Sequence, residues 1–442
     1  MELCVQLFHS GSWHDAATLR FAAPQQGADG PAYLGYQFDY ALAWTDRDDH
    51  YACSLQTPVA LMQEYESAHW FRFLDDIMPA GSARRYWVKQ LAIEHLSAKA
   101  QDFLLLSQGS IAPVGNLRIK EALPERPPGS QLHLRRFRVE DVVERNSDFL
   151  EYAQQMGAIS GGATGAGGEA PKLLLRCSKD NAVWIDTYQD DPSCPDAHYL
   201  VKFPRGSRSA DDCDILRAEY HYYHELAALG VDTIATAGMR LIEGERSPSL
   251  WLPRFDVVFT DGQWQRHGLE SVYSIMDKAP GSYLKHQDVL RALVKRLGTR
   301  QTDFDAAAFT VEWVRRDFLN VAFGNSDNHG RNSALLKKPG RIWLSPVYDF
   351  APMKADPEGV TRTTNWGSPL EEGGNYDWQA IAQALAEKVE PEILLCQLSE
   401  LAKKLLGLKD RLAERGVPKR ILEMPAMGFN HLDDKLKNWG LV

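Results

Sequence analysis

The segment Phe323-Gly-Asn-Ser-Asp-Asn-His-Gly-Arg-Asn332 predicts the architecture of this chain more specifically than any other part of it. Apolar residues recur at helical spacing over the preceding residues 306–323, and Gly324 is typical of the position just past a helix end. We therefore expect residues 325–332 to form a polar loop supported by a rigid helix. Loops of this kind commonly carry catalytic groups.

The residues after this loop predict a β-hairpin. Residues 333–336 and 342–344 have strand-like apolar patterns, and Lys337-Lys-Pro-Gly340 is typical of a turn. A hairpin would return the chain to its starting point, so we expect Asp349 to lie close to Asn332.

Three side chains would gather in this way: Asp327, Asn332 and Asp349. An Asp, an Asn five positions later and a second Asp beyond a hairpin follow the logic of a kinase catalytic loop and metal site. Asp327 would orient and deprotonate an attacking hydroxyl, while Asn332 and Asp349 would supply the hard oxygen ligands that Mg²⁺ prefers. The alternative interpretation is a solvated loop whose Asn and Asp side chains cap turns.

Two charged residues upstream interrupt apolar patterns. Lys202 lies within the apolar strand 198–203, and a lysine inside a strand is rarely buried without a partner. Glu219 falls on the apolar stripe of a helix predicted at 211–229. The simplest interpretation is that these two side chains face each other, as the lysine and glutamate that hold ATP phosphates do in kinases. The alternative is an exposed Glu219 at the edge of its helix.

A glycine-rich stretch, Gly161-Gly-Ala-Thr-Gly-Ala-Gly-Gly168, precedes Lys172 and the next predicted strand. Glycines let backbone N–H groups approach phosphates closely. The stretch is not a Walker loop, because no Gly-Lys-Ser/Thr follows it, and a flexible loop is the alternative. Its place before the strand lysine, the helix glutamate, the Asp/Asn loop and the second Asp gives five elements in kinase order.

Composition limits the function and the location. The chain has 442 residues, with 59 acidic and 49 basic side chains and a net charge of −10, which argues against a protein that coats DNA or an anionic membrane. Its six cysteines have no metal-binding or disulfide spacing, which favours a reducing cytosol. We see neither a secretory leader nor a run of about 18 apolar residues, so we expect a cytoplasmic protein without a membrane span.

The length predicts two or three domains. We expect their boundaries at residues 1–125, 131–253 and 254–442. The proline-rich segment 124–130 is predicted to be a linker. Helical spacing further predicts helices at 65–76, 83–97 and 391–415.

Taken together, these motifs resemble those of the HipA-type serine/threonine kinases, the toxins of bacterial toxin–antitoxin systems. In the C-terminal half the resemblance rests on residues 325–332 and Pro346-Val-Tyr-Asp-Phe350. Near the N-terminus it rests on Phe73-Leu-Asp-Asp-Ile-Met-Pro-Ala-Gly81 and Pro113-Val-Gly-Asn-Leu-Arg118. The length, without an attached repressor domain, is similar to a stand-alone branch of the family.

The resemblance implies an α+β, two-lobed protein-kinase-like (HipA-type) fold with an additional N-terminal α/β subdomain. In chain order, the expected domains would be that subdomain, the ATP-binding kinase N-lobe and the mostly helical, catalytic C-lobe. ATP and Mg²⁺ would be the cofactors, with Asp327 as the catalytic base and Asn332 and Asp349 as metal ligands. The residues expected to bind ATP are Gly167, Gly168, Lys172, Lys202, Glu219, Pro253, Phe255, His329 and Asp349.

Two of these expectations depend on family motifs that the chain matches only in part. Arg254-Phe-Asp256 resembles the family's motif after the interlobe strand, which implies that the backbones of Pro253 and Phe255 bind adenine. The family's glycine loop carries a Ser that is autophosphorylated, followed by Ala-Gly-Ala-Gln. Here the loop is longer and lacks the Gln, and Thr164 is the first candidate for this modification and Ser160 the second.

By the same resemblance, the expected substrate is a cytosolic translation protein such as an aminoacyl-tRNA synthetase. The expected partner is a HipB-like antitoxin, through which any DNA contact would be made. Two alternatives stay open: a small-molecule phosphotransferase on the same fold, and a catalytically silent module that binds an antitoxin. The N-terminal motifs argue against the first, and the intact site residues argue against the second.

Overall fold

The computed structural model describes residues 1–442 except 112–113, 124–133, 157–170, 187–190 and 206–207. The described chain divides into two compact units. The sheet unit consists of Met1–Gly206, Ala237–Pro280 and Ala334–Ser345. The helical unit consists of Ser207–Thr236, Gly281–Ser333 and Pro346–Val442. The two units are therefore interleaved along the sequence.

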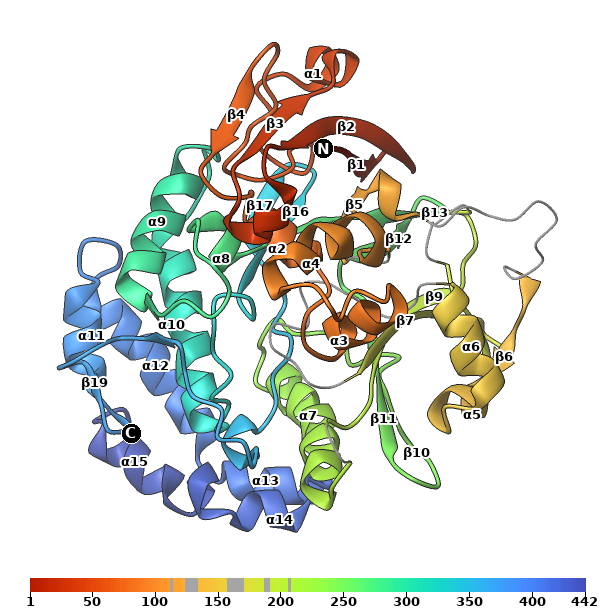
Figure 1. Ribbon diagram of the computed structural model, residues 1–442. Coiled ribbons are helices and arrows are strands. Elements are labelled where there is room, and N and C mark those ends of the chain that lie inside the picture. The colour runs from red at the N-terminus through yellow and green to blue at the C-terminus, as the bar shows by residue number, and fades with distance from the viewer. Residues whose placement is uncertain (112–113, 124–133, 157–170, 187–190, 206–207) are drawn as a thin grey trace. The chain divides into compact units, whose positions relative to one another are not determined.

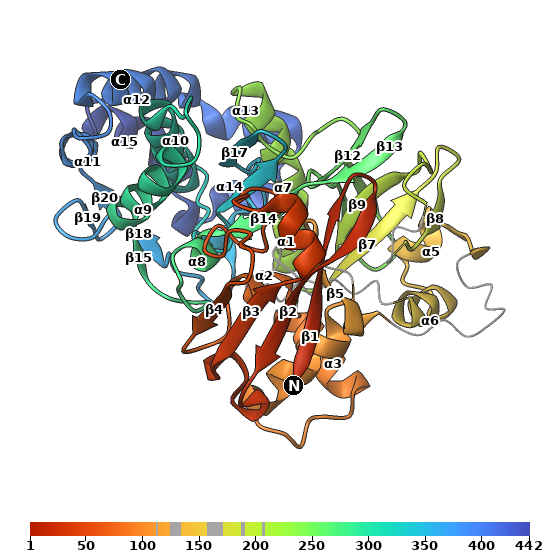
Figure 2. The same cartoon turned by 90° about the horizontal axis from the view of Figure 1, so that it is seen from above.

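The N-terminal part of the sheet unit is an antiparallel sheet with the strand order β4-β3-β2-β1-β5 (Figure 2). Its strands are β1 (Glu2–His9), β2 (Ser12–Phe21), β3 (Ala32–Tyr36), β4 (Glu64–Ser67) and β5 (Leu117–Ile119). The helix α1 (Phe38–Trp44) follows β3. Val5, Leu7 and Ile119 from this sheet lie in one apolar core with residues of later helices. Those helices are α2 (Phe73–Ile77), α3 (Gly81–Gln90) and α4 (Ala98–Leu104).

A second antiparallel sheet in this unit has the strand order β10-β11-β9-β7-β8-β6. Its strands are β6 (Phe137–Arg138), β7 (Lys172–Cys177), β8 (Ala182–Trp184), β9 (Ala197–Lys202), β10 (Arg240–Glu243) and β11 (Pro248–Pro253). β7 is buried along its whole length, in agreement with the apolar run Leu173-Leu-Leu175 at its centre. The helices α5 (Val139–Val143) and α6 (Ser147–Gln155) pack on the sheet through Val142, Phe149 and Tyr152.

Smaller sheets belong to the same unit. The strand β14 (Gly268–Ser271) pairs with β16 (Ala334–Lys338), which pairs with β17 (Arg341–Leu344). The short helix α8 (Val272–Ile275) follows β14, and β12 (Val257–Thr260) pairs with β13 (Gln263–Arg266). The antiparallel pairing of β16 with β17 confirms the predicted hairpin.

The helical unit is built around α10 (Ala306–Ala322), which packs against α9 (His286–Gly298) and α12 (Pro391–Leu405) (Figure 1). Its other helices are α7 (Ala210–Ala228), α11 (Trp378–Ala384), α13 (Leu408–Arg415), α14 (Lys419–Glu423) and α15 (Leu432–Asn438). Short strands also pair in this unit: β15 (Leu284–Lys285) with β18 (Thr364–Asn365), and β19 (Glu371–Glu372) with β20 (Asn375–Tyr376).

The helix predicted at 65–76 is wrong in its first half. Residues Glu64–Ser67 form the strand β4, and only Phe73–Ile77 is helical. Tyr65 pairs with Leu34 of β3, so the sheet satisfies backbone groups that local apolar spacing had assigned to a helix.

The helix predicted at 391–415 is divided into α12 and α13. Gly407, at the break, has a left-handed backbone with φ of 69°. Leu405 and Leu408 on either side are both fully buried, so the apolar face continues across the break. This continuity explains why the spacing of leucines suggested one helix.

Other predicted helices match the structure more closely. The helix expected at 211–229 is α7, Ala210–Ala228. The helix expected at 83–97 is shorter, Gly81–Gln90, and the chain turns at Ala92 with φ of 52°.

The predicted linker at 124–130 lies outside the described residues. The division into 1–125, 131–253 and 254–442 stays a prediction. All six cysteines are free thiols. Over the described ranges, no helix has both the length and the apolar character needed to cross a membrane.

Candidate active site

The loop after α10 starts from a Schellman-type helix end. The Asn325 N–H donates to the Asn320 carbonyl at 2.9 Å, and the Gly324 N–H donates to the Val321 carbonyl at 3.4 Å. Gly324 has φ of 67°, which confirms the predicted end of the helix. The Asn325 side chain extends this arrangement, because its Oδ1 accepts the Asp327 N–H at 3.2 Å. The direction in which the loop leaves the helix is thus fixed.

His329 and Asn332 hold Asp327 from two sides. The Asn332 Nδ2 donates to the Asp327 carbonyl at 2.9 Å, and the His329 Nε2 lies 3.2 Å from the Asp327 Oδ1. The His329 Nδ1 accepts the N–H groups of Arg331 at 3.3 Å and Asn332 at 3.2 Å. The Nδ1 of His329 is thus occupied as an acceptor within the loop, and its Nε2 lies on the side of the Asp327 carboxylate. The half-buried Asp327 carboxylate is therefore oriented by its own loop.

The Asn332 side chain has one oxygen to offer a ligand. Its Oδ1 is buried and accepts no hydrogen bond from any residue in the described part of the chain. The bond from its Nδ2 to the Asp327 carbonyl fixes the orientation of the amide. A buried carbonyl oxygen without a donor costs free energy, which a bound cation would recover. Asn332 therefore fits the predicted role of metal ligand.

Asp349 returns to the loop as the hairpin predicted. The Tyr348 hydroxyl donates to the Arg331 carbonyl, so the residues next to Asp349 and Asn332 are in contact. Asp349 has φ of 52°, an uncommon left-handed backbone for a non-glycine residue, and such backbones cluster at functional sites. Among the residues that the structure describes, no group of three or more His, Cys, Asp or Glu could hold a metal ion. Mg²⁺, however, is usually bound by one or two protein oxygens plus substrate phosphates, which this pair fits.

Glu219 faces the interior of the helical unit, as its position on the apolar stripe predicted. It is 3% exposed, and the buried Tyr223 one turn later donates from its hydroxyl to the Glu219 Oε1 at 3.0 Å. The same hydroxyl accepts the Phe350 N–H at 3.3 Å. Burial, with help from Glu219 and Asp349, raises the pKa of Tyr223 well above its usual value, so the hydroxyl keeps its proton. The predicted pairing of Glu219 with Lys202 stays a prediction.

Asp317 of α10 was not singled out from the sequence, yet it anchors this loop. Its oxygens accept the Asn328 Nδ2 at 2.8 Å, the Arg362 Nη2 at 2.9 Å and the Trp366 Nε1 at 2.8 Å. The His286 Nε2 lies 3.3 Å away. Burial alone would raise the pKa of Asp317, but Arg362 and His286 outweigh it and hold the pKa well below its usual value. One fixed negative charge therefore ties the loop to the later segment that carries Arg362.

In the sheet unit, two predicted ATP-binding lysines are neighbours. Lys172 of β7 lies directly opposite Lys202 of β9, and both side chains are buried. Pro253, predicted to bind adenine, ends β11 opposite Tyr199 of β9, and Phe255 follows two residues later. The strand β9, which carries Lys202, thus lies between β7, which carries Lys172, and β11, which leads to Pro253 and Phe255.

Asp256 of the Arg254-Phe-Asp256 motif has a structural task that the sequence did not indicate. Its carboxylate accepts the Gly115 N–H at 2.7 Å and the Arg254 Nε at 2.9 Å. The Arg266 Nε donates to the Gly115 carbonyl at 2.9 Å. Burial would raise the pKa of Asp256, but Arg254 outweighs it and lowers the pKa. The motif that contains Gly115 and the motif that contains Asp256 were assigned to different domains, and a hydrogen bond joins them.

The predicted glycine-loop residues cannot be placed in this site. Ser160, Thr164, Gly167 and Gly168 lie outside the described residues, so their roles stay predictions.

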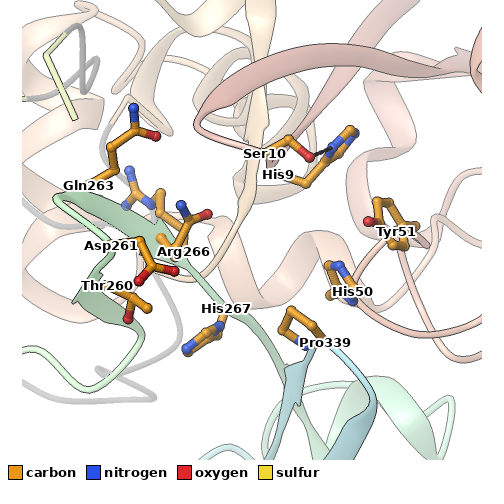
Figure 3. A pocket seen from close by; sticks show the side chains of 11 residues that line it. His9, Ser10, His50, Tyr51, Thr260, Asp261, Gln263, Arg266, His267 and Pro339 are labelled. Atoms are coloured by element: carbon orange, nitrogen blue, oxygen red, sulfur yellow. Dashed lines mark hydrogen bonds between the residues drawn. The ribbon is translucent and has the colours of Figure 1, made fainter. Parts of the chain in front are cut away.

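The sheet unit contains a cavity of about 370 Å³ that no motif predicted (Figure 3). Figure 3 shows Asp261, from the turn between β12 and β13, on one side and His50 on the other. Burial lowers the pKa of His50 to about 4, and burial with His14 and His50 lowers that of His9 to about 4. These imidazoles at the cavity wall are therefore uncharged at neutral pH.

Two family models match the chain. The HipA-like C-terminal domain matches residues 164–406, and the HipA N-terminal domain matches residues 28–120. Because the first match spans more than half of the sequence, the protein belongs to the HipA family, as its motifs predicted.

Individual relatives agree with this assignment. Toxin YjjJ of Escherichia coli (strain K12) is 30% identical over 208 residues, which are 46% of this chain and only 42% of that protein. The solved HipA structure from Shewanella oneidensis MR-1, in complex with HipB and its operator DNA, covers 99% of this chain and 96% of that chain. The TM-score is 0.64 at 15% sequence identity. The predicted α+β, two-lobed, kinase-like HipA fold with an N-terminal subdomain is therefore confirmed.

A second solved structure is more distantly similar. The Helicobacter pylori proinflammatory kinase CtkA covers 64% of this chain and 91% of that chain, with a TM-score of 0.36 and 13% identity.

Proposed function

We propose that this protein is an ATP- and Mg²⁺-dependent serine/threonine protein kinase that acts as a HipA-like toxin. The observation that carries the proposal is the arrangement of Asp327, His329 and Asn332. The loop orients a carboxylate and keeps the Asn332 Oδ1 buried without a donor among the described residues. A solvated loop whose Asn and Asp side chains cap turns has no need of such an oxygen.

Asp327 would receive the substrate hydroxyl. Its Oδ1 is 3.2 Å from the His329 Nε2, which leaves the Oδ2 to accept the hydroxyl proton. His329 would orient this carboxylate through its Nε2, while backbone N–H groups hold its Nδ1. By the family resemblance, the His329 ring would also contact the nucleotide. Asn332 and Asp349 would hold Mg²⁺. When bound, this ion neutralises charge on the transferred phosphoryl group.

The sheet unit would bind the nucleotide. Lys172 and Lys202 lie directly opposite each other, so a polyanion between these strands would be attracted by two positive charges. This favours ATP phosphates as the ligand of the two lysines, with Glu219 as a partner of Lys202. The backbones of Pro253 and Phe255 would bind adenine. The glycine loop would cover the phosphates through Gly167 and Gly168, with autophosphorylation at Thr164 or Ser160.

The comparisons support a toxin–antitoxin setting. One relative is a toxin, and the solved HipA is bound to HipB and operator DNA. We propose a HipB-like antitoxin as the partner and a cytoplasmic translation protein, such as an aminoacyl-tRNA synthetase, as the substrate. The net charge of −10 favours DNA contact through the antitoxin rather than through this chain.

The test is a phosphorylation assay. The protein is incubated with γ-labelled ATP, Mg²⁺ and a bacterial lysate, beside the variant Asp327→Asn, which keeps the size of the side chain but cannot accept the proton. We expect label on serine or threonine of a lysate protein with the wild type only.

Other outcomes would point elsewhere. Label on a small metabolite would make the protein a small-molecule phosphotransferase. Absence of any Asp327-dependent label, from a chain that still binds a HipB-like antitoxin, would make it a catalytically silent regulator.

A further inference from the structure

We propose that Tyr223 is a positioning residue that couples the nucleotide-binding Glu219 to the metal-binding Asp349. The inference rests on the proposed kinase function and adds a residue that belongs to none of the predicted motifs. All of the contacts involved lie within the helical unit.

The Tyr223 hydroxyl joins two segments that are far apart in the sequence. It donates to the Glu219 Oε1 at 3.0 Å and accepts the Phe350 N–H at 3.3 Å. A carboxylate can only accept and a backbone N–H can only donate, so the hydroxyl hydrogen has one allowed direction. Tyr223 itself is fully buried, so water cannot replace either partner.

The peptide that follows Asp349 has little freedom to move. The Phe350 ring packs against Phe323 at 5.4 Å and Tyr222 at 6.1 Å between ring centroids. Its N–H is held by the Tyr223 hydroxyl. Asp349 therefore takes its left-handed backbone, with φ of 52°, next to a residue fixed on two sides.

These contacts link two binding events. If Glu219 turned away, the hydroxyl of Tyr223 would lose its acceptor in a buried site, which is unfavourable. If the peptide after Asp349 moved, the same hydroxyl would lose its donor. Nucleotide binding that fixes Glu219 and metal binding that fixes Asp349 thus favour the same position of Tyr223. Coupling of this kind is reciprocal, so each ligand raises the affinity for the other.

The test removes the hydroxyl alone, with Tyr223→Phe. Calorimetry measures the affinity for a non-hydrolysable ATP analogue with Mg²⁺ and with a chelator. In the wild type we expect Mg²⁺ to tighten binding, and in the variant we expect this gain to be smaller by about 5- to 10-fold. A purely structural role for Tyr223 would not change the ratio of the two affinities.

A matched control is Tyr152→Phe. Tyr152 is also fully buried and its hydroxyl accepts a backbone N–H, that of Ile185 at 3.1 Å, but it belongs to the sheet unit. This variant should keep the full Mg²⁺ gain. Thermal unfolding without nucleotide reports whether both variants fold.

A second pair of variants changes Glu219, the acceptor of the Tyr223 hydroxyl. Glu219→Gln keeps an oxygen acceptor for the Tyr223 hydroxyl, whereas Glu219→Leu does not. We expect the Mg²⁺ gain to be larger in the first than in the second. An unchanged gain in folded Tyr223→Phe, or equal gains in the Glu219 pair, would overturn the inference. Failure of the wild type to bind the analogue at all would instead overturn the proposed function.

Discussion

Asn332 has two polar atoms with different tasks. Its Nδ2 holds the Asp327 carbonyl, while its Oδ1 is buried without a donor among the described residues. In Asn332→Ala, we expect the Mg²⁺ concentration needed for half-maximal phosphoryl transfer to rise by at least about 10-fold. The free energy of unfolding should change by no more than about 1 kcal/mol, because one hydrogen bond and one unsatisfied oxygen are lost together. Initial rates against Mg²⁺ concentration, and urea unfolding, measure the two effects.

The exposed Asn375 on β20 offers the control for this variant. Asn375→Ala should leave both the Mg²⁺ requirement and the stability unchanged. An Asn332→Ala protein with wild-type Mg²⁺ dependence would remove Asn332 from the metal site.

A second prediction for a single residue concerns the contribution of the Asp317 charge to the free energy of unfolding. Asp317→Asn removes the charge that compensates the buried Arg362, and we expect a loss of about 3–5 kcal/mol in the free energy of unfolding. Glu312→Gln, on the same helix, weakens only ion pairs near the surface with Arg315 and Arg316 and should cost at most about 1 kcal/mol. Urea unfolding of both variants compares them. Equal losses would show that the Asp317 network does not stabilise the loop.

The roles of some of these residues could be predicted from the sequence, and those of others could not. Glu219 could be predicted to face inward because a charge stood out on an apolar stripe. Asp317 also lies on an apolar helix face, but its partners His286 and Arg362 are distant in the sequence and belong to no motif. The orientation of the Asn332 amide was equally inaccessible, because it depends on hydrogen bonds that exist only in the folded loop.

At the scale of elements, the break between α12 and α13 depends on one glycine. Gly407 has φ of 69°, and a Cβ added there would meet only the Arg411 Nη1 at 3.9 Å. Gly407→Ala should therefore lower the free energy of unfolding by about 1–2 kcal/mol through backbone strain alone.

Gly298, at the end of α9, is the opposite case. Its backbone is not left-handed, and an added Cβ would make an ordinary contact with Phe304 at 3.7 Å. Gly298→Ala should raise the free energy of unfolding by about 0.4–1 kcal/mol. Chemical denaturation distinguishes the two signs, and stabilisation by both substitutions would contradict the role assigned to Gly407.

Elements held by local interactions were predictable, and elements held by distant partners were not. α7 and the β16–β17 hairpin were predicted close to their observed bounds, because helix spacing and turn residues are local signals. β4 was missed because an edge strand is stabilised by its neighbour β3. The break at Gly407 was missed because burial continues across it.

At the scale of the whole molecule, buried histidines make stability depend on pH. The pKa values of His9 and His50 are lowered to about 4, and burial with Arg176 lowers the pKa of His198 well below its usual value. In the unfolded chain the pKa of each of these histidines is near its ordinary value of about 6.5. Between about pH 6.5 and 4 the unfolded chain therefore binds more protons than the folded chain. Stability is therefore complete above this window and decreases as the pH falls through it.

Urea unfolding from about pH 7 to about pH 5 measures this dependence. His50→Gln should flatten it, because one of the responsible groups is removed. The lowered pKa of Asp317 acts in a separate window, since its contribution is present above about pH 4 and is lost only below it. A stability that does not change down to about pH 5 would contradict the burial of neutral histidines.

Long-range connections were the least predictable feature of the whole molecule. The bond between Asp256 and Gly115 joins motifs about a third of the chain apart, and both motifs were recognised without any indication that they meet. Pairing between such segments depends on the order of strands in space, which apolar patterns in one sequence do not specify.

The interleaving of the two units also has a consequence for synthesis. The sheet unit includes Ala334–Ser345, so it stays incomplete until the ribosome has passed that hairpin. At about 5–20 residues per second, α7 and α9 emerge several seconds before its last strands, and α10 precedes them by about one to two seconds. Asp349 then follows the hairpin within about a second. A nascent chain released before Asp349 would lack the second carboxylate, and one released before the hairpin would also lack the closing strands, so neither could transfer phosphate under the proposed function.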